Sequence, residues 1–306
     1  MARRRPKGWL AVGWACVESA ALGRSEHCPT AECYPDTLVR RETFLDGAGN
    51  GWSISMLTTP RARPAAWKIV VVTGTPSWSE YWAPVLAALP QDREMVVVDR
   101  PGFANSEPFD HVPDIHVQAK ALAPLLAVAP GQKLMLVGQS YGAAIATLMA
   151  ASRPKGVASL VLLSAFFGEP GPTARWLIDM GSRTLKVIPR DLRNAVLEAS
   201  NQAPQLDAVR AALGRLKMPV HVVHGDKDDF APIEIAERLV AEARGALPVQ
   251  VQRLPGGDHF LNDGVDAVLT SLEACLPPTR EPWLRWPALP QFRWPKLKAP
   301  QQMLEA

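Results

Sequence analysis

The sequence lacks several features that would point to a membrane protein or a cofactor enzyme. No apolar run is long enough to cross a membrane as a helix, and no internal repeat is visible. There is no G-x-G-x-x-G segment, no P-loop lysine, no H-E-x-x-H and no C-x-x-C, so we expect neither a bound cofactor nor a metal. A net charge of +3 over 306 residues gives no sign of a nucleic-acid groove.

Cysteine is also scarce, with four residues that do not suggest a disulfide framework. Hydrophobic residues make up 47% of the chain, which is enough to bury a full core without cross-links. The length fits one α/β domain of ordinary size with terminal extensions.

The most informative segment is G-Q-S-Y-G at residues 138–142. An apolar run at 133–137 precedes it and reads as a buried strand, and strong helix formers follow at 143–150. A G-x-S-x-G segment between a strand and a helix is typical of a nucleophile elbow, a turn so sharp that only small residues fit two positions before and after the serine. The pattern therefore indicates that Ser140 is a nucleophile.

Ser140 needs a histidine to take its proton and a carboxylate to hold that histidine. A strand at 218–224 ends in an acidic loop at 225–229, and a strand at 249–254 leads into the loop that carries His259. The order serine, acid, histidine places the last two on loops at the carboxyl ends of strands, where ligands collect in parallel sheets.

Together these segments resemble the α/β-hydrolase fold family, from about Trp67 to about Leu276. Thr73-Gly74-Thr75-Pro76 is similar to the family's His-Gly-x-Pro oxyanion loop, and residues 99–106 are similar to its D-x-P-G-x-G-x-S segment. Residues 138–142 are similar to its elbow. Residues 225–232 are similar to its G-x-x-D-x-x-x-P acid loop, and residues 257–260 are similar to its histidine loop.

The resemblance assigns three catalytic roles. Ser140 is the expected nucleophile and His259 the general base. Asp228 is the expected acid because it follows Gly225 by three residues, where the family places its carboxylate. Asp226 and Asp229 are the competing candidates in this acidic loop.

The oxyanion hole is expected to consist of the backbone N–H groups of Tyr141 and Thr75. The family's usual histidine at the start of this loop is replaced here by Thr73. The histidine generally supports the loop, so we expect the Thr73 hydroxyl to bond nearby backbone instead.

Other histidines receive no catalytic role. His221 and His224 alternate with apolar residues in one strand and are assigned to the core. His111 and His116 lie in a polar stretch.

The expected fold is a mostly parallel eight-stranded sheet with helices on both faces and a short helical lid. The α/β-hydrolase core occupies 36–164 and 218–276, and the lid occupies 165–217. Strands are expected in a hairpin over 36–58 and at 67–73, 94–99, 133–138, 158–164, 218–224 and 248–254.

The lid is expected to contain short helices near 173–187, 191–200 and 206–214 and to cover the catalytic edge. Gly74, Phe166 and Trp176 are the residues expected to contact the substrate.

The two ends have unusual compositions. Residues 1–35 begin with basic and apolar stretches in the outline of a signal peptide, although Glu18 interrupts the apolar run. The tail at 277–306 is rich in proline, tryptophan and basic residues, which fits either a strap packed on the body or a peripheral membrane contact. A cytoplasmic location is favoured slightly.

The function favoured by these residues is a serine hydrolase that cleaves a carboxylic ester or related acyl bond of a small to medium apolar substrate. Thioester, carbon–carbon and perhydrolase chemistry remain open. The alternatives are a cofactor-free oxygenase or lyase on the same scaffold, with His259 as base, and a non-catalytic binding or membrane-associated protein that uses the tail.

Overall fold

The structure is a computed structural model that describes residues 39–153, 155–245, 248–261 and 264–276. The predictions for the N-terminal extension at 1–35 and for the tail at 277–306 lie outside these residues.

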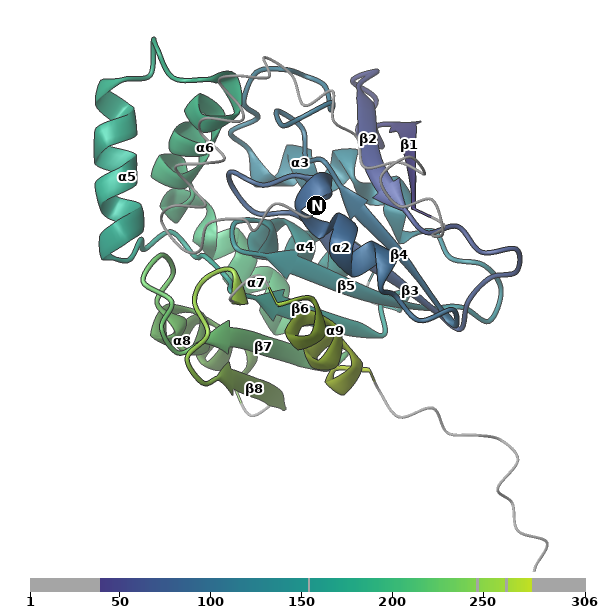
Figure 1. The fold of residues 1–306 in the computed structure, drawn as a ribbon. Coiled ribbons are helices and arrows are strands. Elements are labelled where there is room, and N and C mark those ends of the chain that lie inside the picture. Colours follow the sequence, from purple (N-terminus) through teal and green to yellow (C-terminus); the bar gives the residue numbers. More distant parts are fainter. Residues whose placement is uncertain (1–38, 154, 246–247, 262–263, 277–306) are drawn as a thin grey trace, which may run out of the picture. The chain divides into compact units, whose positions relative to one another are not determined.

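Eight strands form one sheet in the order β1-β2-β4-β3-β5-β6-β7-β8 (Figure 1). Their bounds are β1 (Arg40–Leu45), β2 (Ser53–Thr58), β3 (Trp67–Val72), β4 (Arg93–Val98), β5 (Lys133–Gln139), β6 (Ser159–Leu163), β7 (Val220–Gly225) and β8 (Val249–Leu254). β2 pairs antiparallel with β1 and β4, and every other neighbouring pair is parallel. The mostly parallel eight-stranded sheet predicted from the sequence is confirmed.

Helices cover both faces of this sheet (Figure 1). One face carries α3 (Ile115–Ala121), α4 (Gly142–Ser152), α7 (Leu206–Arg215) and α8 (Ile233–Arg244), and the other carries η1 (Ser79–Trp82), α2 (Ala83–Ala87) and α9 (Val265–Ala274). Short 3₁₀ helices lie at η2 (Ala123–Leu126) and η3 (Ala203–Gln205).

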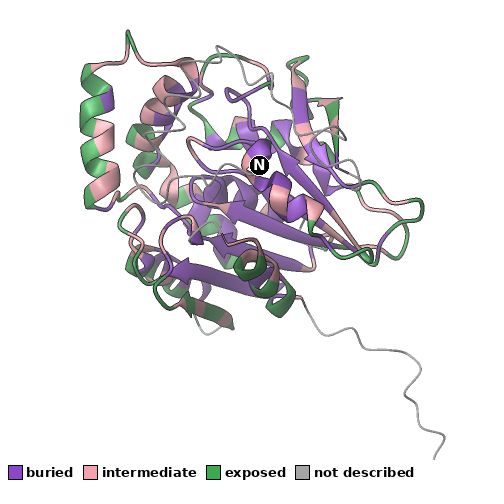
Figure 2. Cartoon of the chain, in the orientation of Figure 1, coloured by how far each residue is buried: buried purple, intermediate pink, exposed green. Residues whose placement is uncertain are grey.

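The apolar strands explain this layering. Successive side chains of a strand point to opposite faces, so Val70 and Val72 of β3 join one core cluster while Ile69 and Val71 join the other. A parallel strand covered on both faces needs an uninterrupted apolar run, which the central strands supply. Figure 2 shows these strands buried over most of their length.

The segment inserted between β6 and β7 contains α5 (Pro172–Arg183), α6 (Arg190–Asn201) and α7. α5 packs against α6, whereas α7 packs against α4 and α8. α7 buries Val209, Ala212 and Leu213 in the core, so it belongs to the helical layer of the sheet even though the predicted lid range included it. The helices outside that layer are α5 and α6.

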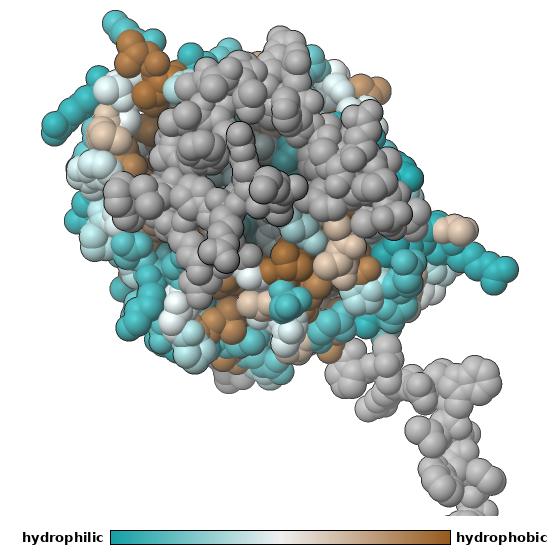
Figure 3. All heavy atoms as spheres, viewed as in Figure 1, coloured by the Kyte–Doolittle hydropathy of each residue, from teal (hydrophilic) through white to brown (hydrophobic). Residues whose placement is uncertain are grey.

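α5 is the most exposed of the inserted helices (Figure 2). Trp176 and Met180 on α5 are 62% and 46% exposed, and Val187 in the connection to α6 is 81% exposed. Figure 3 shows hydrophobic side chains at the surface near this connection. No helix in the described ranges is long and apolar enough to span a membrane.

Candidate active site

Ser140 lies at the turn from β5 into α4 with a φ of 49°, in the left-handed region that non-glycine residues rarely adopt. The turn brings the chain very close to its neighbours. A Cβ added to Gly138 would lie 2.5 Å from the Cα of Ala143, and one added to Gly142 would lie 2.3 Å from the carbonyl oxygen of Val72. Both positions therefore require glycine, as expected for a nucleophile elbow.

The three predicted catalytic side chains form one hydrogen-bonded chain. His259 Nε2 lies 3.1 Å from Ser140 Oγ, and His259 Nδ1 lies 2.7 Å from Asp228 Oδ2. Because a carboxylate can only accept, the imidazole hydrogen belongs on Nδ1, and the Nε2 lone pair faces the serine hydroxyl. The arrangement has the geometry that moves a proton from serine to histidine.

The structure also separates Asp228 from the two competing carboxylates. Asp226 accepts from the Gly256 N–H at 2.7 Å, and Asp229 accepts from the Thr173 hydroxyl at 2.5 Å. Among the three carboxylates, the one hydrogen-bonded to His259 is that of Asp228.

The side chain of Asp228 is buried and accepts hydrogen bonds at both carboxylate oxygens. Its Oδ1 accepts from the backbone N–H groups of Phe230 and Ala231, each at 2.9 Å. Burial alone would raise the pKa of Asp228, but the interaction with His259 and the hydrogen bonds from His224, His259 and Ala231 outweigh it and hold that pKa well below its usual range. The carboxylate is therefore ionised at neutral pH.

Aromatic rings flank His259. The Phe230 ring stacks on the imidazole at 5.3 Å between centroids, and the Phe260 ring meets it edge-on at the same separation. The rings restrict the imidazole orientation and limit the access of water. Asp258 Oδ1 accepts from the Phe260 N–H at 2.9 Å and so helps to hold this loop.

His224 is buried in β7, as the strand pattern predicted, but it also has a partner in the site that the pattern did not show. It is completely buried at the end of β7, and its Nε2 lies 2.8 Å from Asp228 Oδ2 and 2.7 Å from the carbonyl oxygen of Ala231. Both neighbours are acceptors, so Nε2 carries the hydrogen and donates to them. His224 therefore contacts the candidate acid, whereas none of the described hydrogen bonds or ion pairs joins Asp228 to His221, which is also buried on β7.

Replacing His224 with leucine is expected to lower kcat by roughly tenfold or more, because a hydrogen bond to a charged group contributes about 1.5–3 kcal/mol. Replacing it with glutamine should restore much of the loss, since a glutamine amide can place a donor near the Nε2 position. Steady-state hydrolysis of p-nitrophenyl acetate measures both. His221→Leu is the matched control and should leave kcat nearly unchanged. Equal losses for the leucine and glutamine variants of His224 would contradict this role.

The predicted oxyanion loop lies beside the serine. A Cβ on Gly74 would lie 2.8 Å from Ser140 Cβ and 3.5 Å from Ser140 Oγ, so only glycine allows this approach. The Thr73 hydroxyl donates to the Val98 carbonyl at 3.0 Å, as expected for a substitute loop support. The assignment of the Thr75 and Tyr141 N–H groups as oxyanion donors stays a prediction.

The two other predicted substrate contacts differ in position. Phe166 is buried, and its backbone N–H donates to the Ser140 carbonyl at 3.1 Å, so it lies next to the elbow. Trp176 lies on α5 and is mostly exposed. Its contact with substrate stays a prediction that the described contacts do not support.

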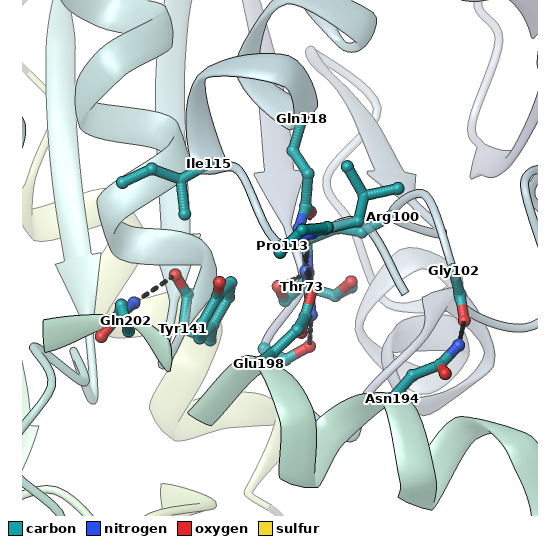
Figure 4. Close-up of polar contacts among 12 residues, drawn as sticks. Thr73, Arg100, Gly102, Pro113, Ile115, Gln118, Tyr141, Asn194, Glu198 and Gln202 are labelled. Carbon is teal, nitrogen blue, oxygen red and sulfur yellow. Dashed lines mark hydrogen bonds and ion pairs between the residues drawn. The ribbon is translucent and has the colours of Figure 1, made fainter. Parts of the chain in front are cut away.

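No role in the site was predicted for Arg100 or for any individual residue of α6, the lid helix expected near 191–200. Arg100 is bonded to the Thr73 and Gly74 carbonyls and to Glu198 of α6 (Figure 4). Asn194 and Gln202 approach the site from the same inserted segment, where they donate to the carbonyls of Gly102 and Tyr141 (Figure 4). The described residues include no group of three or more histidine, cysteine, aspartate and glutamate side chains placed to hold a metal.

Comparison with known proteins agrees with this architecture. A model of the family described as alpha/beta hydrolase fold matches residues 69–206. The biotin biosynthesis bifunctional protein BioHC of Teredinibacter turnerae is 33% identical over 87 residues, which are 28% of this chain and only 14% of that protein.

Solved structures show the same fold. A thermophilic esterase from Thermogutta terrifontis has a TM-score of 0.58 at 18% identity, covering 77% of this chain and 97% of that one. The 2-hydroxy-6-oxo-6-phenylhexa-2,4-dienoate hydrolase of Rhodococcus sp. strain RHA1 has a TM-score of 0.59 at 17% identity, covering 77% and 98%. The chain is therefore a protein of the α/β-hydrolase fold.

Proposed function

We propose that this protein is a serine hydrolase that cleaves a carboxylic ester, or a related acyl bond, of a small to medium apolar substrate. The observation that carries the proposal is the hydrogen-bonded chain from Ser140 through His259 to Asp228 at the carboxyl edge of the sheet. The names of the two structural neighbours, an esterase and a dienoate hydrolase, fit this class of reaction.

The reaction follows from the positions of the groups. Ser140 Oγ attacks the acyl carbon while its proton passes to His259 Nε2, and Asp228 stabilises the resulting imidazolium. The negative oxygen of the tetrahedral intermediate accepts from the N–H groups of Thr75 and Tyr141. Collapse breaks the bond to the leaving group, which takes the proton from His259. Water then attacks the acyl-enzyme and gives a proton to His259. The bond from the acyl carbon to Ser140 Oγ breaks, His259 returns the proton to Ser140, and the acid is released.

Apolar side chains around the serine favour an apolar acyl group. Phe166 is next to the elbow, and Phe230 and Phe260 enclose the imidazole. A small-molecule acyl compound is the substrate partner that fits these surroundings.

Intact-mass labelling with a fluorophosphonate tests the proposal. A single adduct on the wild type and none on Ser140→Ala is the expected result, because phosphonylation requires an activated serine. A panel of acyl esters of increasing chain length would then define the substrate range. A folded wild type that gives no adduct and hydrolyses no ester would refute the proposal.

A further inference from the structure

Arg100 is fully buried beside the predicted oxyanion loop after β3, and each of its five N–H donors has an acceptor. Nε donates to the Thr73 carbonyl at 2.7 Å, Nη1 to Gln118 Oε1 and Glu198 Oε1 at 2.8 Å each, and Nη2 to the Gly74 carbonyl at 2.8 Å and Glu198 Oε2 at 2.9 Å. Such a complete set of bonds fixes the guanidinium in one orientation.

The bond to Gly74 fixes the orientation of the next peptide. The Gly74–Thr75 peptide is trans, so its carbonyl and its N–H point in opposite directions. Arg100 holds the carbonyl on one side of the loop, and the Thr75 N–H consequently points away from Arg100. That N–H is the predicted oxyanion donor, and Gly74 lies beside the Ser140 hydroxyl.

Arg100 also touches the second half of the predicted hole. Its guanidinium lies 4.9 Å from the centre of the Tyr141 ring, and Tyr141 supplies the other backbone N–H. Arg100 therefore contacts the ring of Tyr141 and the carbonyl of Gly74, the residue before Thr75. Figure 4 shows Arg100 and Tyr141.

α6 provides the countercharge. Glu198 is fully buried, makes a bidentate pair with Arg100, and accepts a further bond from Gln118 at 2.8 Å. Asn194 and Glu198 lie on the same side of α6, and Gln202, the residue directly after that helix, continues their spacing of four residues. Through hydrogen bonds of these three side chains, Asn194 holds the loop after β4, Glu198 holds Arg100, and Gln202 holds the elbow.

We infer that Arg100 is a positioning residue for the oxyanion hole and that Glu198 holds Arg100 in place. α6 is thus part of the framework that holds the active site. The inference rests on the proposed function, because an oxyanion forms only if Ser140 attacks an acyl carbon.

If the Arg100–Glu198 pair only stabilised the fold, a folded variant that lacks both charges would keep the wild-type kcat. Replacing a buried ion pair with apolar residues of similar size is often neutral for stability, whereas removing one partner leaves a buried charge uncompensated. The double variant Arg100→Met/Glu198→Met therefore keeps the packing but removes the donor to the Gly74 carbonyl. The exposed bidentate pair Arg253–Glu237 offers a matched control, as Arg253→Met/Glu237→Met.

The experiment compares folding, kcat and KM for p-nitrophenyl acetate, and the inhibition constant of an aryl trifluoromethyl ketone, which forms a tetrahedral adduct with an oxyanion. Folding is followed by circular dichroism. The double variant is expected to fold and to lose about 10- to 100-fold in kcat with KM changed less than about threefold, since loss of an oxyanion donor costs roughly 10²–10³ in kcat. The inhibition constant should rise by a similar factor, and the control should match the wild type.

Glu198→Gln provides an independent arm that keeps the side-chain shape. It should lower kcat several-fold with little change in KM, and it decides the matter if the double variant does not fold. A folded double variant, or failing that a folded Glu198→Gln, with wild-type kcat and ketone inhibition would overturn the inference. Fluorophosphonate labelling of the wild type separates the two proposals, because a labelled wild type with unaffected variants refutes only the positioning role.

Discussion

Replacing Ser140 with alanine is expected to remove nearly all hydrolytic activity, and replacing His259 with alanine should cost almost as much. A loss on the order of 10⁵–10⁶ in kcat is the scale for such a unit. The reason is geometric, since the hydroxyl is a useful nucleophile only while His259 Nε2, 3.1 Å away, can take its proton. The double variant Ser140→Ala/His259→Ala should be no slower than either single variant.

Controls for this comparison are available in the same chain. Ser164 is another buried serine at positive φ, at the end of β6, and Ser164→Ala should retain activity. His116→Ala on the exposed side of α3 should do the same. The measurement is single-turnover and steady-state hydrolysis of p-nitrophenyl acetate, with circular dichroism to confirm folding. A His259→Ala protein that keeps most of its activity would show that another group acts as the base.

The parts of the site that could be predicted from sequence are those fixed by local backbone demands. Gly138 is required because a side chain there would meet Ala143 of the same turn, and Gly142 because one would meet the carbonyl oxygen of Val72 on β3. Both demands fall on backbone positions of one sharp turn, so they appear within five consecutive residues. The central strands were also predictable, because burial on both faces imposes an apolar run on each of them.

The parts that could not be predicted depend on pairs distant in sequence. Arg100 and Glu198 each look like an ordinary surface charge until the fold brings them together across 98 positions. The inward stripe of α6 is polar, so the usual link between burial and hydrophobicity fails at that helix.

The contact of His224 with Asp228 was missed for a related reason. Alternation with apolar residues correctly placed it in a buried strand, but it did not show which group it faces. Its position as the next-to-last residue of β7, four residues before Asp228, was the available signal. A polar residue at the carboxyl end of a parallel strand lies at the ligand-binding edge and should be considered for the site.

Replacing Asp228 with asparagine is expected to lower kcat by roughly 10⁴-fold, the scale of an acid-to-amide change in a serine, histidine and aspartate unit. Asp228 Oδ1 accepts from two backbone N–H groups, so the asparagine oxygen must take that position. The new NH₂ group then faces His259 Nδ1 and His224 Nε2, where the carboxylate had accepted from both. To avoid donor against donor, His259 must carry its hydrogen on Nε2, and it can no longer accept the proton of Ser140.

The neighbouring acids give matched controls within one loop. Asp226→Asn keeps an oxygen for the Gly256 N–H, and Asp229→Asn keeps one for the Thr173 hydroxyl, so each should stay within a few-fold of the wild type. Steady-state kcat on p-nitrophenyl acetate ranks the three variants, and thermal unfolding shows whether a loss reflects chemistry or folding. If Asp226→Asn or Asp229→Asn were the slowest, the acid of the unit would have to be reassigned. The loss must be specific to Asp228 because only its carboxylate joins the backbone of the acid loop to the imidazole that faces Ser140.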